Sequence, residues 1–275
     1  MAGQVQGQLL AAGGHGLPGR PVLPVWGRAL VVLALAGIAG YVDAVGYLDL
    51  VGVYTSHMSG NTAAIGRYFG VGDWQHALEH AWPLIAFVIG LIAGATLTEL
   101  ARRRGYHSRM SLVMGMEIVL LAILARADPL QAASTLWLGL PAIAMGMQTV
   151  TVTRVGEQRV YSTYITGSLS KFGEALTGYG FWLVDRWRAR QGGRTGGESG
   201  WLSNAHRGTM LRHAGLNLGL WSLFLLGATS GALISGAKGL QALWWPILGL
   251  VLLVLLDWRH PIAPIEPGEP LGFDA

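Results

Sequence analysis

Polar side chains that could bind a solute or carry a proton gather in one short stretch, Tyr54–Thr62, whose sequence is YTSHMSGNT. It follows an apolar run long enough to cross a bilayer and lies where a second membrane helix should begin. A helix broken inside hydrocarbon leaves amide and carbonyl groups that must be buried in protein or line a watery cavity. The hydroxyls could satisfy those groups, and a helix N-terminus near Gly60 would aim its positive dipole end into the cavity. The alternative is an ordinary interfacial helix start, capped by Ser59 or Asn61.

Four ionisable residues lie in apolar or helical segments, where an unpaired charge is costly. Asp43 lies deep in the first apolar run, Glu117 lies near the middle of the third, and Lys171 and Glu174 are three residues apart on one helix face. His57 could also titrate near neutral pH. We treat Asp43, Glu117, Lys171 and Glu174 as candidates for proton coupling. Each also has a purely structural interpretation, as a helix cap, a bond to a neighbour's hydroxyl or a stabilising pair.

The composition is that of an integral membrane protein. Of the 275 residues, 52% are apolar and 12% are charged, whereas a soluble domain carries about 25% charged residues. Such a chain cannot cover itself with polar surface, so lipid must replace water around it. The absence of cysteine excludes disulfides, thiolate metal sites and a cysteine nucleophile.

Apolar runs and polar interruptions predict an all-α integral membrane fold. Two segments, Ser59–Gly70 and Thr166–Val184, look helical but are too polar or too short to span, so we expect short broken or re-entrant helices there. Six runs of spanning length, or near it, should be transmembrane helices: Ala29–Leu50, Trp82–Leu100, Met110–Ala125, Leu136–Val152, Leu216–Ser235 and Leu243–Leu256.

Arginine placement orients this topology. We expect a disordered N-terminal tail (1–25), a single transmembrane domain (26–258) and a C-terminal tail (259–275). Fifteen arginines then fall on one side of the membrane, against only Arg67, Arg126 and Lys238 on the other. Because cytoplasmic loops carry an excess of basic residues, both termini and the loop 186–212 should be cytoplasmic.

Recurring glycines predict an inverted repeat with halves at about 26–126 and 132–258. A small polar motif in each half is followed by a glycine six residues after its central glycine, and the next full span carries a GxxxG pair. With three spans in each half, the second copy must be inverted relative to the first. The matched residues are Ser59-Gly60-Asn61 with Gly66, Thr166-Gly167-Ser168 with Gly173, Gly90/Gly94, and Gly227/Gly231.

The sequence also resembles a known family. The pentapeptide GYVDA (Gly40–Ala44), the stretch Thr55–Thr62 and the segments Gly146-Met147-Gln148 and Thr166-Gly167 are similar to the YoaK family of bacterial membrane proteins, over roughly Leu30–Leu256. Ser59 stands where that family has threonine, which keeps the hydroxyl. The resemblance implies a multi-pass protein of the bacterial inner membrane, but it implies no substrate or mechanism.

These observations together favour a secondary transporter or permease for a small polar or anionic solute, with proton coupling as a further expectation. An integral-membrane enzyme acting on a lipid or headgroup, and a non-catalytic module that binds a partner through its GxxxG faces, are the alternatives. We expect no catalytic residue, metal, cofactor or nucleic acid; the expected partners are the bilayer and the solute, and a homo-oligomer is compatible. The candidate solute-binding residues are Asp43, Thr55, Ser56, His57, Ser59, Gly60, Asn61, Thr62, Gln148, Thr166, Gly167 and Ser168.

Overall fold

The structure is a computed structural model that describes residues 23–50, 52–105, 110–128, 135–151, 153–155, 158–190 and 204–262. Most of the two predicted tails, 1–22 and 263–275, lies outside the described residues, as does the segment 191–203 of the predicted cytoplasmic loop.

Helices form at each of the six apolar runs, but among the described residues only three stretches have the length and hydropathy to cross a membrane. These are α2 (Val25–Asp49), α4 (Trp74–Arg103) and the stretch Gly208–Arg259. The last of these comprises most of α9 (Asn204–Lys238), the 3-10 turn η3 (Gly239–Leu243) and α10 (Trp244–Arg259).

Outside these three stretches, two described helices of the bundle are shorter than a spanning helix. The apolar α5 (Met110–Ala125) has 16 residues, and α7 (Gly139–Thr149), which follows the 3-10 turn η1 (Thr135–Leu138), has 11. A bilayer needs about 20 residues of straight helix. The predicted count of six spans therefore stays a prediction.

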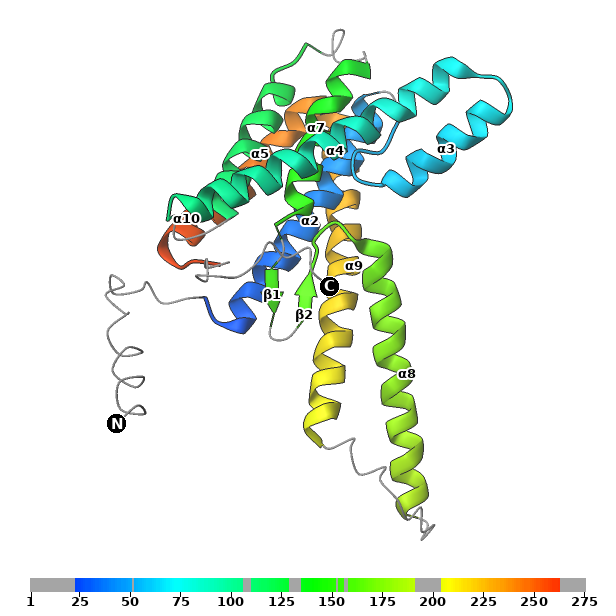
Figure 1. Cartoon of the computed structure of the whole chain (residues 1–275), viewed down its shortest axis with the longest axis vertical. Coiled ribbons are helices and arrows are strands. Elements are labelled where there is room, and N and C mark those ends of the chain that lie inside the picture. The colour runs from blue at the N-terminus through cyan, green and yellow to red at the C-terminus, as the bar shows by residue number, and fades with distance from the viewer. Residues whose placement is uncertain are drawn as a thin grey trace, which may run out of the picture.

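Two helical hairpins leave the bundle, one toward each end of the molecule (Figure 1). In the first, α3 (Met58–Gly70) packs against α4; in the second, α8 (Ile165–Arg190) packs against α9. The predicted short helix at Ser59–Gly70 is thus present with 13 residues.

The second hairpin differs from the prediction, because α8 is one unbroken helix of 26 residues. Its hydroxyls do not interrupt it. Ser168 Oγ and Ser170 Oγ donate to carbonyl oxygens four residues earlier, at Tyr164 (3.1 Å) and Thr166 (3.3 Å). Serine can remain in a helix when it bonds the preceding turn in this way. The helix also takes up residues 186–190 of the predicted loop.

Glycines let α2 and α9 pack backbone to backbone. A Cβ at Gly227 would lie 2.0 Å from the carbonyl oxygen of Gly37, and a Cβ at Gly231 would lie 2.7 Å from that of Tyr41. From the α2 side, a Cβ at Gly40 would lie 2.1 Å from the carbonyl oxygen of Phe224. The contacts advance together along both helices, so α2 and α9 run parallel.

The pair α4 and α7 packs in the same manner. A Cβ at Gly90 would lie 2.2 Å from the carbonyl oxygen of Ile143, and a Cβ at Gly146 would lie 2.2 Å from that of Phe87. At Gly94 the nearest backbone atom is Met147 Cα, at 3.0 Å. Only glycine permits such approaches. Both GxxxG pairs therefore lie at helix contacts within this bundle.

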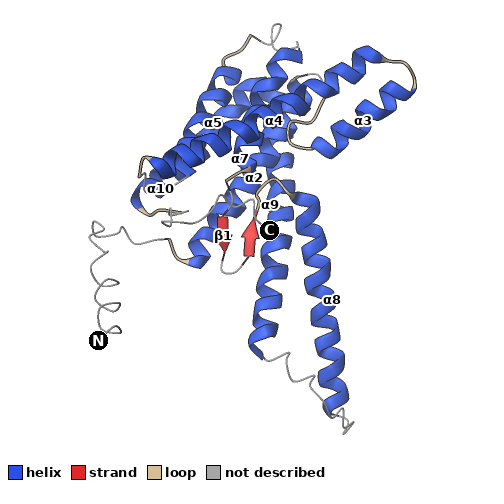
Figure 2. Cartoon of the chain, viewed as in Figure 1, coloured by secondary structure: helices blue, strands red, loops and turns tan. Residues whose placement is uncertain are grey.

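A small antiparallel hairpin interrupts the otherwise helical chain (Figure 2). Strand β1 (Thr153–Val155) pairs with β2 (Gln158–Val160), with Arg154 opposite Arg159. The sequence interpretation missed it, although Gly156 lies between two short segments that each contain valine, a combination compatible with a hairpin.

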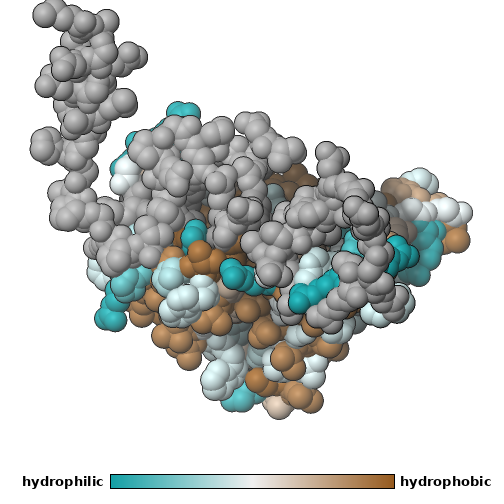
Figure 3. Space-filling view, turned by 90° about the horizontal axis from the view of Figure 1, so that it is seen from below, coloured by the Kyte–Doolittle hydropathy of each residue, from teal (hydrophilic) through white to brown (hydrophobic). Residues whose placement is uncertain are grey.

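Apolar side chains form patches on the coloured part of the face seen in Figure 3, interspersed with polar ones. Long apolar side chains are exposed on the outward faces of α4, α9 and α10, and they include Ile89, Ile92, Leu226, Leu233, Leu252 and Leu255. Exposed apolar area on this scale marks a surface that meets lipid or another protein. The buried core lies between α2, α5, α7 and α10.

Candidate functional site

The carboxylate of Asp43 holds the loop between α2 and α3 against α2. Its Oδ1 accepts hydrogen bonds from the backbone N–H of Thr55 (2.8 Å), Oγ1 of Thr55 (2.9 Å) and the backbone N–H of Ser56 (2.8 Å). Its Oδ2 lies 2.7 Å from Nδ1 of His57. Asp43 is only 3% exposed, so these four contacts compensate for the water that it loses on burial. The structure thereby brings four of the predicted site residues together.

Two glycines let this loop turn back along α2. Gly52 has φ of 70°, a conformation that glycine adopts at little cost. Gly46 faces Thr55, because a Cβ at position 46 would lie 2.7 Å from the Thr55 methyl carbon. A side chain at Gly46 would therefore push Thr55 away from Asp43, which lies one helical turn earlier on α2.

A pocket of about 550 Å³ opens beside the Asp43–His57 pair. The side chain of His57 is 40% exposed and that of Asp43 is 4% exposed, so a solute in the pocket would meet the imidazole rather than the carboxylate. The ring centroids of Tyr54 and Phe224 lie 5.1 and 5.5 Å from that of His57. The pocket is lined by Asp43, Ala44, Tyr47, Leu48, Tyr54, His57, Ser59, Gly60, Phe224, Ala228 and Ala232.

The rest of the YTSHMSGNT stretch supports the loop or faces outward. Asn61 is buried, donates from Nδ2 to the carbonyl oxygen of Tyr54 (2.9 Å) and places Oδ1 3.4 Å from Nδ1 of His80 on α4. It therefore ties the loop to both helices of the first hairpin. Thr62 is exposed and donates to the carbonyl oxygen of Met58 (2.8 Å).

The predicted site residues of the second half lie elsewhere. No α8 residue is among those that line the pocket within the described part of the chain, so Thr166, Gly167 and Ser168 do not close it. Gln148 is buried in α7, where its Nε2 donates to the carbonyl oxygen of Leu35 (3.0 Å) and to Ser162 Oγ (3.0 Å). Gln148 braces two helices rather than facing a solute.

The remaining proton-coupling candidates are also separate from the pocket. Glu117 is fully buried in α5, and neither carboxylate oxygen has a hydrogen-bond partner among the described residues. Lys171 and Glu174 are exposed on α8, and within the described ranges they form no ion pair with each other. Over the same ranges, no group of three or more His, Asp or Glu side chains could hold a metal ion.

Comparison with known proteins places the chain in a family. A family model described as "Protein of unknown function (DUF1275)" matches residues 31–256. This chain belongs to the DUF1275 family. Relatives that it resembles are named as transmembrane proteins, which agrees with the apolar helices of this chain, and the predicted resemblance to the YoaK family is confirmed.

Two of these relatives are bacterial. The UPF0700 transmembrane protein YoaK of Bacillus subtilis (strain 168) is 28% identical over 153 residues, which cover 55% of this chain and 68% of the relative. The UPF0700 transmembrane protein RA0705 of Rhizobium meliloti (strain 1021) is 28% identical over 236 residues, which cover 86% and 88%. No solved structure matches the chain.

In this DUF1275 protein, Nδ1 of His57 and Oδ2 of Asp43 are close enough to share a proton beside the pocket. When Asp43 is ionised, Nδ1 of His57 carries the proton that points at Oδ2, which fixes the ring and leaves Nε2 for other partners. Among the described residues Nε2 has no hydrogen-bond partner. Protonation of His57 converts Nε2 from an acceptor into a charged donor.

The aromatic wall around His57 was not predicted. Tyr47 stacks on Tyr54 at 4.7 Å, and Phe224 comes from α9 in the other half of the chain. Tyr47 could have been found, because it lies four residues after Asp43 and therefore on the same helix face. Phe224 could not have been found, because no local pattern pairs α9 with α2.

The pH dependence of stability should report on this pair. His57 lies in the loop outside the membrane-spanning helices, and its pKa is raised, chiefly by its hydrogen bond to Asp43. A raised pKa in the folded state stabilises the protein fully below the unfolded pKa of about 6.5, and the gain is lost as pH rises through the folded pKa. We expect thermal stability in detergent to fall as pH rises above about 6.5 in the parent, and His57→Gln to reduce this slope. An identical slope in both proteins would contradict the pairing.

Proposed function

We propose that this DUF1275 protein is a secondary transporter or permease for a small polar or anionic solute, coupled to protons through Asp43 and His57. One observation carries the proposal. A carboxylate buried in a membrane helix is linked at 2.7 Å to an imidazole that faces a pocket, and ionisable groups inside membranes typically mark ion or proton pathways.

The walls of the pocket favour a small solute with one charged or polar group. Ala44, Ala228 and Ala232 leave space, and Tyr54 and Phe224 provide apolar faces near His57. Binding sites of this kind combine mostly apolar walls with a few well-placed polar groups. Protonated His57 would attract the anionic end of a solute, and loss of the proton would release it.

We also propose that the chain is an inverted repeat of six spans, as transporters of this kind often are. The support is matched packing in the two halves: residues of α2 correspond to residues of α7 that lie 106 positions later, and residues of α4 to residues of α9 that lie 137 positions later. Corresponding residues make corresponding contacts. The pairs are Gly37 with Ile143, Gly40 with Gly146, Tyr41 with Met147, Phe87 with Phe224, Gly90 with Gly227, and Gly94 with Gly231.

The same correspondence supports the proposal that proton exchange takes place in the first half of the chain. Thr149 lies 106 positions after Asp43, and its Oγ1 is 2.8 Å from Oγ1 of Thr163, just before α8. In the first half Asp43 bonds Thr55 in the equivalent place, just before α3. Among the described residues, each half thus fastens the segment before its hairpin helix to its first helix, through a carboxylate in the first half and through two hydroxyls in the second.

The membrane orientation is a further part of the proposal. We place the protein in the bacterial inner membrane with both termini in the cytoplasm, because the arginines segregate to that side. Since the chain has no cysteine, single introduced cysteines can be labelled cleanly. An impermeant maleimide should label Ala237→Cys, which is exposed at the end of α9, in intact cells. Ser199→Cys, which lies outside the described residues, should react only after lysis. Labelling of Ser199→Cys in intact cells would contradict this orientation.

An assay that needs a sealed bilayer distinguishes transport from the main alternative, which is an enzymatic activity. An Asp–His pair could also serve as a general base in a membrane enzyme that acts on a lipid headgroup. We expect solute-dependent proton movement in sealed proteoliposomes, read by a trapped pH-sensitive dye, and no turnover in detergent micelles. Turnover of a lipid or headgroup in micelles would favour the enzyme instead.

A further inference from the structure

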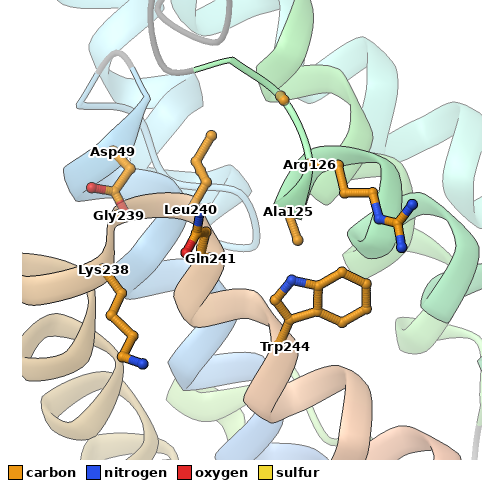
Figure 4. A pocket seen from close by; sticks show the side chains of 9 residues that line it. Asp49, Ala125, Arg126, Lys238, Gly239, Leu240, Gln241 and Trp244 are labelled. Carbon is orange, nitrogen blue, oxygen red and sulfur yellow. The ribbon is translucent and has the colours of Figure 1, made fainter.

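A second pocket of about 550 Å³ lies where three parts of the bundle end (Figure 4). Asp49 contributes from the last residue of α2, and Arg126 follows the end of α5. Lys238, Gln241 and Trp244 contribute from the end of α9, from η3 and from the start of α10. Arg126 and Lys238 stand on opposite sides of Trp244 in this view.

Among the described residues, the two cations of this pocket form no ion pair. The guanidinium of Arg126 lies 5.6 Å from the ring centroid of Trp244, which orients it without cancelling its charge. Among the described residues, neither Arg126 nor Lys238 has a carboxylate within salt-bridge distance. The carboxylate of Asp49 instead accepts a hydrogen bond from Ser235 (2.6 Å). Two unpaired cations therefore face a pocket with a single carboxylate.

We propose that this pocket binds an anionic phosphate group, carried either by a lipid headgroup or by a soluble anion. A guanidinium offers parallel N–H donors that match phosphate oxygens, and an ammonium adds a point charge. Gln241 supplies an amide, and Trp244 forms an apolar wall at the side.

The site is distinct from the His57 pocket and does not rest on the proposed transport function. Asp49 lies six residues beyond Asp43 on α2, and Lys238 lies six residues beyond Ala232 on α9. At 1.5 Å per residue this places the second pocket about 9 Å further along both helices. An anion held here would be close to the first pocket without sharing its ligands.

Titration of the purified full-length protein in neutral detergent tests the site, with inorganic phosphate and short-chain phosphatidylglycerol as separate probes at low ionic strength. Thermal unfolding should shift upward with at least one probe, because a ligand that binds only the folded state stabilises it. Arg126→Gln and Lys238→Gln should each weaken the apparent affinity about tenfold, as expected for one lost charge-assisted hydrogen bond. Arg67→Gln, which removes an arginine stacked on Tyr68 at 4.7 Å outside the pocket, should bind like the parent.

Each outcome decides the proposal. A shift with the lipid alone identifies a headgroup site, and a shift with inorganic phosphate identifies a site for soluble anions. The proposal is overturned if neither probe stabilises the parent, if both pocket variants bind like the parent, or if Arg67→Gln weakens binding as much as they do. Should one pocket variant fail to fold, the other variant decides.

Discussion

Replacing Gly227 by alanine should destabilise the protein by at least about 2 kcal/mol, although the change adds a single methyl group. The new carbon would lie 2.0 Å from the carbonyl oxygen of Gly37, so α2 and α9 would have to move apart. Backbone atoms cannot rotate out of the way as a side chain can. Gly90→Ala should act alike between α4 and α7, where the distance is 2.2 Å. Unfolding in detergent, by heat or by a denaturing detergent, measures the loss.

Glycines in open positions provide the matched control. Gly66 in α3 and Gly173 in α8 have no atom within 4 Å of an added Cβ among the described residues. Because alanine favours the helix over glycine, Gly66→Ala and Gly173→Ala should leave stability unchanged or raise it by up to about 1 kcal/mol. If all four variants melt alike, helix approach at Gly227 and Gly90 is not what stabilises the fold.

Removing the carboxylate of Asp43 should have the second large effect. Asp43→Ala leaves two buried donors of Thr55 and one half-buried donor of Ser56 without their acceptor and takes away the partner of His57. Breaking a buried charged network in this way costs about 3–5 kcal/mol. We expect the loop between α2 and α3 to detach, which would be visible as faster proteolysis or hydrogen exchange in residues 52–57.

Two variants separate charge from hydrogen bonding at this position. Asp43→Asn keeps an oxygen that can accept the three loop bonds, so it should cost far less than Asp43→Ala while removing the charge. Asp49→Ala, on the same helix, loses one hydrogen bond from Ser235 and should cost about 1 kcal/mol. Equal losses for Asp43→Ala and Asp49→Ala would show that Asp43 does not hold the loop.

Local patterns in the sequence predicted the long helices and the close contacts of the fold. The apolar runs of α2, α4 and α9 are longer than those of helices in soluble proteins, which predicts membrane helices. The GxxxG pairs of α4 and α9 predict close helix contacts whichever helix lies opposite them. The pattern could not say which helix lies opposite each pair, because α2 and α9 meet across almost the whole chain. That information exists only in the tertiary structure.

The candidate site was predicted only in part, because its contacts also depend on the tertiary structure. Asp43 and His57 attract attention as ionisable residues in an apolar context, but their contact depends on a loop that turns back at Gly52. The second motif misled because serine and glycine can break a helix or remain inside one. In α8 the hydroxyls of Ser168 and Ser170 bond the preceding turn, and the helix continues.

Solute-driven proton flux in sealed proteoliposomes tests the central claim most directly. The parent, His57→Gln and His76→Gln would be compared with a trapped pH-sensitive dye. His76 is the matched control, because its Nδ1 also lies 2.7 Å from an aspartate oxygen, that of Asp73, but at an exposed site outside the His57 pocket. We predict that His57→Gln abolishes the flux, while His76→Gln retains it. Full proton-coupled uptake by a correctly folded His57→Gln variant would contradict the claim that this pair carries the proton.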